Sequence, residues 1–140
     1  MEAIKVRYVP VIILLGYLSY VDLKKREVPD LAVLALFIYS LLACRNLKEG
    51  LITGGLVFIV HLSAAVITNG GIGGGDIKLM SVLAFLLGRD FFLMVLPMAW
   101  LMIAMLVYAL FTGRGLRYSI PLVPYIFISF VLWRWFLWKA

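Results

Sequence analysis

The sequence predicts an all-α membrane protein, a bundle of about six transmembrane helices joined by short loops. Hydrophobic residues make up 65% of the 140 positions, whereas a soluble domain has about 45–50%. Charged residues make up only 14% of the chain. The apolar residues also gather in six stretches, separated by short polar or glycine-rich segments. An apolar surface of this extent needs lipid as its solvent.

The six apolar stretches are justified in chain order by the polar or glycine-rich segments that end them. They cover residues 8–21, 31–44, 51–68, 77–87, 91–111 and 119–138. A helix needs about 20 residues to cross the hydrocarbon core. The first, second and fourth stretches are shorter, so they need flanking residues, snorkelling lysines or shielding by neighbouring helices. We expect a single domain over residues 1–140 with antiparallel neighbouring helices.

Composition excludes several classes of function. The formal charge of +6 is typical of loop lysines and arginines that face anionic lipid, so we expect membrane lipid as a partner and no nucleic acid. Cys44 is the only cysteine and His61 the only histidine. Those two residues cannot supply a disulfide or a Cys-based zinc site. We therefore predict no metal and no cofactor.

The first motif is a glycine-rich segment that ends in an acid, Gly73-Gly74-Gly75-Asp76-Ile77-Lys78. Glycine lets the backbone approach another segment closely, which favours a site around Asp76. The alternative is a flexible turn in which Asp76 caps the next helix. A phosphate-binding loop is a third option, but no Gly-Lys-Ser/Thr sequence follows.

The second motif is the polar run from Asp22 to Asp30, which contains Arg26 and Pro29. Its basic residues are expected to contact lipid headgroups, and Pro29 is expected to start the next helix. Asp22 directly follows an apolar stretch. An acid is costly there, so a functional role is the default hypothesis.

Counting spans places the two acids on one side of the membrane. Asp22 closes the first span and Asp76 opens the fourth, and two crossings lie between them. The basic cluster 24–26 favours the cytoplasm as that side, although the positively charged amino-terminal segment argues the other way. Two carboxylates brought together cannot both ionise easily. The charged one takes a proton from water, and the neutral one polarises a scissile carbonyl and later protonates the leaving amine.

Together these motifs resemble the type IV prepilin peptidases, the A24 family of GxGD membrane aspartyl proteases. The resemblance covers nearly the whole chain and implies that Asp22 and Asp76 are catalytic. Asp30 differs from the asparagine-like residue expected at its position. Supporting or substrate-binding roles are assigned to six residues: Gly73, Gly75, Lys78, Arg26, Pro29 and Asp30.

The resemblance also implies a substrate: a prepilin-like (pilin or flagellin) precursor with a basic leader followed by an apolar helix. Cleavage is expected at their junction, on the cytoplasmic face of a multi-pass protein of the cell membrane. Only the short run 22–30 joins the first two spans, and it contains no cysteine. The chain therefore resembles the short family forms of Tad-type pilus or preflagellin systems, and we expect no N-methyltransferase activity.

Three other functions stay open at this point. A presenilin-type GxGD protease would place its first acid inside a span, whereas Asp22 lies at the end of one. A small transporter or proton channel would use Asp22, Asp76 and His61 as a relay. A membrane scaffold without catalysis would use the aspartates only to cap helices.

Overall fold

A computed structural model of the chain describes residues 7–69, 73–112 and 121–139. The described residues are helical, and they contain no strand. The predicted all-α fold class is therefore confirmed. Six helices follow one another: α2 (Val9–Lys25), α3 (Asp30–Ala43), α4 (Leu47–Ile67), α5 (Gly74–Leu87), α6 (Asp90–Phe111) and α7 (Val123–Lys139).

Local signals explain most of the helix ends. Arg26 ends α2 in the left-handed conformation (φ 54°) and Gly88 ends α5 with φ 59°. Asn46 caps α4 because its side-chain oxygen accepts a hydrogen bond from the backbone N–H of Glu49 at 3.3 Å. The first apolar stretch was expected to stop at residue 21, but α2 continues to Lys25. Lysines in the last turn complement the negative end of the helix dipole, which favours this longer helix.

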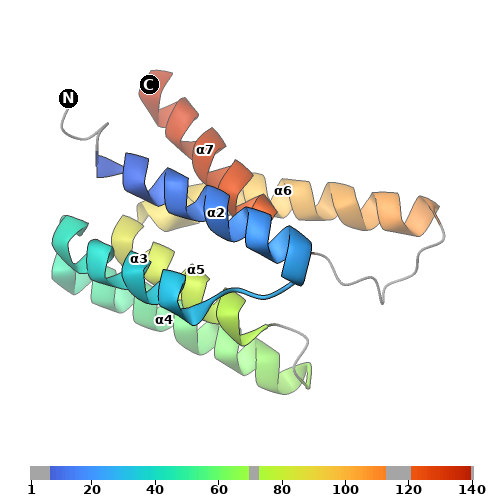
Figure 1. Cartoon of the computed structure of the whole chain (residues 1–140), viewed down its shortest axis with the longest axis horizontal. Helices are drawn as coiled ribbons and strands as arrows, with labels where there is room; N and C mark the ends of the chain where they lie inside the picture. Colours follow the sequence, from blue (N-terminus) through green and yellow to red (C-terminus); the bar gives the residue numbers. More distant parts are fainter. Residues whose placement is uncertain (1–6, 70–72, 113–120, 140) are drawn as a thin grey trace.

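Consecutive helices run in alternating directions and form two groups (Figure 1). In one group α5 packs against both α3 and α4, and in the other α7 packs against both α2 and α6. Contacts between the groups are sparser and come mainly from α2 with α3 and from α5 with α6. The carboxyl end of α2 and the amino end of α5 lie at the same end of the bundle (Figure 1). Each group thus brings one acid-bearing helix end to that region.

Two glycines allow the tightest contact in the bundle, between α4 and α5. A Cβ on Gly50 would lie 2.5 Å from the carbonyl oxygen of Phe85, and one on Gly54 would lie 3.0 Å from the carbonyl oxygen of Ser81. The Thr53 hydroxyl donates a hydrogen bond to the carbonyl oxygen of Ala84 at 2.9 Å. Small residues that let two backbones meet are typical of helix packing in membranes.

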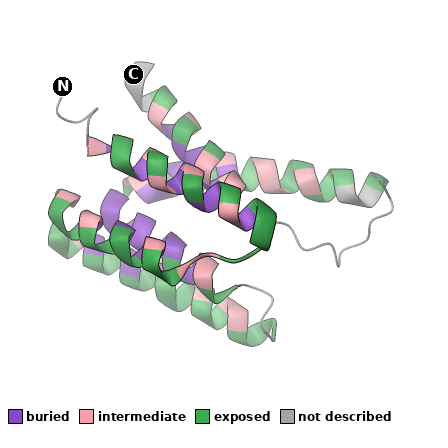
Figure 2. Ribbon diagram, in the orientation of Figure 1, coloured by how far each residue is buried: buried purple, intermediate pink, exposed green. Residues whose placement is uncertain are grey.

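The helices differ in how well they suit a membrane. Among the described residues, α4 and the Asp90–Tyr108 part of α6 are long and apolar enough to cross one. Length and composition therefore identify two spans where about six were predicted. α5 has 14 residues, or about 21 Å of helix, and nine of them are buried. Figure 2 shows these buried residues between the helices, whereas the outward faces are exposed. Many large apolar side chains lie on those outward faces, which agrees with a lipid environment.

Candidate active site

Asp22 lies in the last turn of α2, and its side chain is buried with 6% exposure. The helix continues past it, because the N–H of Arg26 donates to the carbonyl oxygen of Asp22 at 2.8 Å. A carboxylate in this turn faces the negative end of its own helix dipole, which is unfavourable. The position therefore requires compensation from another part of the fold.

The start of α7 supplies that compensation. The backbone N–H of Val123, the first residue of α7, donates a hydrogen bond to Oδ2 of Asp22 at 3.1 Å. The amino end of a helix carries a partial positive charge and unsatisfied N–H groups, both of which stabilise an anion. The packing of α2 against α7 thus prepares a place for a charged Asp22.

Asp76 is the third residue of α5, and the cap of this helix is Gly73. The alternative in which Asp76 is the capping residue is therefore wrong. Oδ1 of Asp76 is buried and has no hydrogen-bond partner among the described residues. A buried polar atom without a partner is uncommon in native proteins and calls for an explanation, such as a catalytic role.

The environment of Asp76 favours its protonated form. Asp76 lies outside the two helices that are long enough to cross a membrane. Burial and, after it, the negative charge of Asp22 raise the pKa of Asp76 from 3.8 to about 6. The two acids therefore interact through their charges, and Asp76 gives up its proton less readily than an ordinary carboxyl group.

Both acids line one open cavity of about 480 Å³, which we call the aspartate cavity. Asp22 reaches it from the α2–α6–α7 group and Asp76 from the α3–α4–α5 group. The structure therefore brings together the two residues for which the sequence predicted catalysis. Other polar and small residues complete the lining: Arg26, Glu27, Val28, Asp30, Gly73, Gly74, Gly75 and Lys78.

Gly75 allows the α2–α3 connection to pass close to the start of α5. A Cβ on Gly75 would lie 2.7 Å from the Cβ of Val28, closer than side chains tolerate, whereas a Cβ on Gly74 would meet nothing within 4 Å. A Cβ on Gly73 would lie 3.2 Å from Oδ2 of Asp76. Gly73 and Gly75 thus make room, respectively, for the Asp76 side chain and for the segment that follows Asp22.

The other predicted residues occupy different places around the cavity. Lys78 Nζ forms an ion pair with Oδ1 of Asp30 at 2.8 Å, and both side chains are exposed. Arg26 lines the cavity. Pro29 precedes the first residue of α3 as its cap and is not among the lining residues. Arg26, Asp30 and Lys78 therefore line the aspartate cavity, and Pro29 sets the start of α3.

His61 does not belong to the aspartate cavity. It lies within α4, and its Nδ1 is 2.8 Å from the carbonyl oxygen of Val57 in the same helix. A relay through Asp22, Asp76 and His61 has no support in this arrangement, so the transporter alternative is not favoured.

Sequence reasoning assigned no role to Glu27, Val28, Gly74 or the backbone N–H of Val123, although these groups also contribute to the site. Val28 could have been found from its place between the two motifs. Every residue except proline carries a backbone N–H, so no residue type could have marked Val123.

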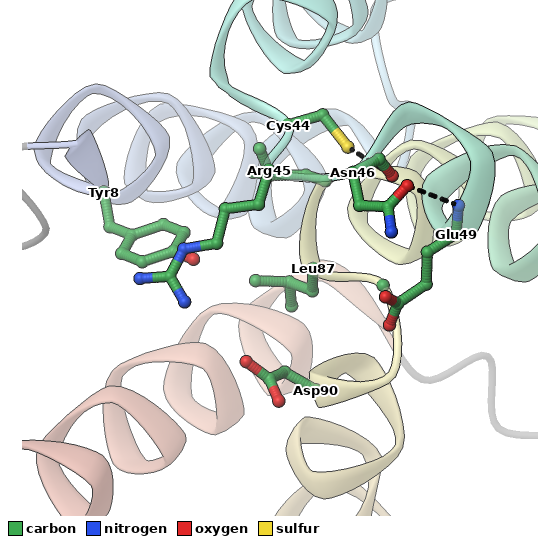
Figure 3. Close-up of a pocket in the computed structure, with 9 residues that line it drawn as sticks. Tyr8, Cys44, Arg45, Asn46, Glu49, Leu87 and Asp90 are labelled. Carbon is green, nitrogen blue, oxygen red and sulfur yellow. Dashed lines mark hydrogen bonds between the residues drawn. The ribbon is translucent and has the colours of Figure 1, made fainter.

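A second cavity of about 210 Å³ lies where the α3–α4 and α5–α6 connections meet, with Tyr8, Cys44, Arg45, Asn46, Glu49 and Asp90 in its lining. Figure 3 shows that the Cys44 thiol donates a hydrogen bond to the backbone carbonyl oxygen of Asn46. The side-chain oxygen of Asn46 accepts a hydrogen bond from the backbone N–H of Glu49. Oε1 of Glu49 also accepts from the backbone N–H of Arg89 at 2.9 Å. The hydrogen bonds here hold the two connections together and give this cavity a structural role. We therefore place the functional site at the aspartate cavity, which contains both predicted catalytic acids.

A comparison with known protein families identifies the family of this chain. The sequence model of the type IV leader peptidase family matches residues 9–113, which include both aspartates and the glycine motif. No curated protein and no solved structure gives a significant match. The match covers well over half of the 140 residues and contains both halves of the aspartate cavity. On this evidence the chain belongs to the type IV leader peptidase family.

Proposed function

We propose that this protein is a membrane-embedded aspartyl endopeptidase that removes the basic leader of prepilin-like precursors. The observation that carries the proposal is the aspartate cavity itself. Two acids from different helix groups share it, and the charge of Asp22 helps to raise the pKa of Asp76. A pair of carboxyl groups with unequal proton affinity is what hydrolysis of a peptide bond by two acids requires.

The two acids take different roles. Asp22 is the charged base, because the start of α7 stabilises its carboxylate. Asp76 is the acid, because its burial favours the protonated form. Asp22 takes a proton from water, and the remaining hydroxide attacks the scissile carbonyl carbon while Asp76 donates a hydrogen bond to the carbonyl oxygen. Asp76 then protonates the amine as the C–N bond breaks, and the proton on Asp22 returns to Asp76 through water.

The membrane arrangement is inferred from the cavity that the two acids share. We propose that both aspartates lie at one boundary between membrane and water, because they line one cavity at one end of the bundle. The basic residues that follow Asp22 favour the cytoplasmic side for that boundary. The substrate helix then stays in the lipid while its leader enters the aspartate cavity. Only residues 26–29 join α2 to α3, so we propose peptidase activity without methyltransferase activity.

A cleavage assay with matched variants tests this function. Purified protein is mixed with a prepilin-like substrate, and Asp22→Asn and Asp76→Asn are assayed separately. Each substitution is expected to lower the cleavage rate by about 10²–10⁴-fold, the usual contribution of a general acid or base. Asp90→Asn is the control, because Asp90 lines the second cavity instead. A cleavage rate close to that of the wild type in either single variant excludes the two-aspartate mechanism.

A further inference from the structure

An apolar groove of about 550 Å³ lies beside the aspartate cavity, formed by α3, α4 and α5. Its walls are the apolar side chains of Leu31, Val33, Leu34, Phe37, Phe58 and Val82, and Asp30, Lys78 and Ser81 complete its lining. Asp30 and Lys78 line the aspartate cavity as well. The groove and the cavity therefore meet at these two residues.

A weak contact marks the point where they meet. The Asp30–Lys78 ion pair is short, at 2.8 Å, but its side chains are 72% and 52% exposed. Exposed ion pairs contribute little to stability. The pair can therefore open when another charged group approaches, at little energetic cost to the fold.

The aspartate cavity and the groove differ sharply in chemical character. Asp76 is the protonated acid in the proposed mechanism, and the cavity lining still has an excess of acidic groups without it, in a chain whose formal charge is +6. The charged groups are Asp22, Glu27 and Asp30 against Arg26 and Lys78. An acidic lining in a basic protein attracts a cationic segment. The adjoining groove has no such charge along its apolar walls, so it suits an apolar segment.

We propose that the groove binds the apolar segment that follows the cleaved bond, while the basic leader occupies the aspartate cavity. This inference rests on the proposed function and assigns substrate recognition to residues outside both motifs. Leu34, Phe37 and Phe58 are then specificity-determining residues, and Asp30 and Lys78 lie at the boundary between leader and apolar segment. A substrate that is basic and then apolar matches the two regions in their order.

Recognition in the groove depends on shape, because lipid is as apolar as the groove walls. Between apolar surfaces in a membrane the attraction comes from close packing, and removal from water adds little. A variant that fills the groove with a larger, mainly apolar side chain is therefore the sharpest test. Leu34→Trp does this, and Leu93→Trp on α6 is a matched control. Leu34 is 52% exposed, Leu93 is 50% exposed, and Leu93 does not line the groove.

Two substrates separate the groove from the catalytic step. One is a prepilin-like protein with its apolar helix, and the other is a short peptide that ends just after the cleaved bond. Leu34→Trp is expected to raise KM for the first about tenfold, with kcat within about twofold, because the larger side chain occupies space that the apolar segment needs. The same variant should cleave the short peptide normally. Leu93→Trp should behave as wild type with both.

The outcomes are distinguishable. If the wild-type protein cleaves neither substrate, the proposed function fails. If it cleaves both and Leu34→Trp leaves KM unchanged, or slows both substrates equally, the groove is not the recognition surface. Phe58→Ala provides an independent check, because it enlarges the groove. It should improve cleavage of a precursor whose apolar segment carries a bulkier side chain, and a failure to do so also contradicts the proposal.

Discussion

Oδ2 of Asp22 accepts a hydrogen bond from the backbone N–H of Val123 at 3.1 Å, across 101 positions of sequence. The bond joins the carboxyl end of α2 to the amino end of α7. It places a carboxylate at the positive end of a helix dipole, although the same carboxylate lies at the unfavourable end of its own helix. The relationship gives the buried Asp22 carboxyl group a hydrogen-bond donor from another helix, beside Asp76, whose pKa is raised to about 6.

Removing that N–H is expected to impair catalysis with little effect on the helix. Val123→Pro deletes the donor, and proline is well tolerated at the first position of a helix. A hydrogen bond to a charged group is worth about 1.5–3 kcal/mol, so kcat/KM should fall about tenfold or more. Val123→Ala keeps the N–H and should retain near wild-type activity. Equal activity of the two variants would show that the bond does not support Asp22.

The rate of cleavage should depend on the protonation of Asp76. Its pKa is raised to about 6, so turnover is expected to fall as the pH rises through about 6 and the acid loses its proton. The pH profile of kcat, measured with a prepilin-like substrate in detergent, checks this. Asp90→Asn should leave the profile unchanged. A rate that stays constant from pH 5 to 8 would contradict the role of Asp76 as the acid.

The free energy of unfolding should also depend on the protonation of Asp76, and it should fall as the pH rises. Between pH 3.8 and about 6 the folded protein holds a proton on Asp76 that the unfolded chain releases. Raising the pH through this window therefore lowers the free energy of unfolding. Asp76→Asn removes the titrating group. The melting temperature of this variant should therefore increase relative to that of the wild type as the pH rises from 4 to 7. A difference independent of pH would contradict the assigned pKa.

Two neighbouring glycines should respond differently to alanine. Gly75→Ala forces its new Cβ to within 2.7 Å of the Cβ of Val28, whereas Gly74→Ala meets open space. We expect Gly75→Ala to displace the segment after Asp22 and to lower kcat/KM, and Gly74→Ala to have little effect. Adding Val28→Gly to Gly75→Ala should restore part of the loss. Equal rates for the two alanine variants would show that this contact does not position the acids.

Alanine substitutions at two glycines of α4 should also differ in their effect on stability. Gly50→Ala places a Cβ 2.5 Å from the carbonyl oxygen of Phe85, whereas Gly55→Ala on the same helix meets nothing within 4 Å. Alanine is favoured over glycine inside a helix by about 0.8–1 kcal/mol. Thermal unfolding in detergent should show Gly55→Ala unchanged or stabilised and Gly50→Ala destabilised. The reverse order would contradict the close approach of these helices.

The positions of the helices were largely predictable, because each long apolar stretch ends at residues that interrupt helices locally. Stretches 31–44 and 91–111 became Asp30–Ala43 and Asp90–Phe111. The polar residues after position 21 predict a loop, whereas α2 continues to Lys25, because Lys24 and Lys25 can extend a helix that ends in solvent. Among the described residues, length and composition identify α4 and part of α6 as spans. Membrane crossing by the shorter helices, such as α3 and α5, stays a prediction.

The sequence by itself determined the helical class, the two acid-bearing motifs and the family they resemble. Those features depend on residue types in a local order. Only the tertiary structure decided that Asp22 meets the start of α7, that Gly75 lies against Val28, and that an apolar groove adjoins the aspartate cavity. The physical reason is that each of these contacts joins distant segments through a backbone group or through a surface shared by several helices, and neither carries a signature in residue type.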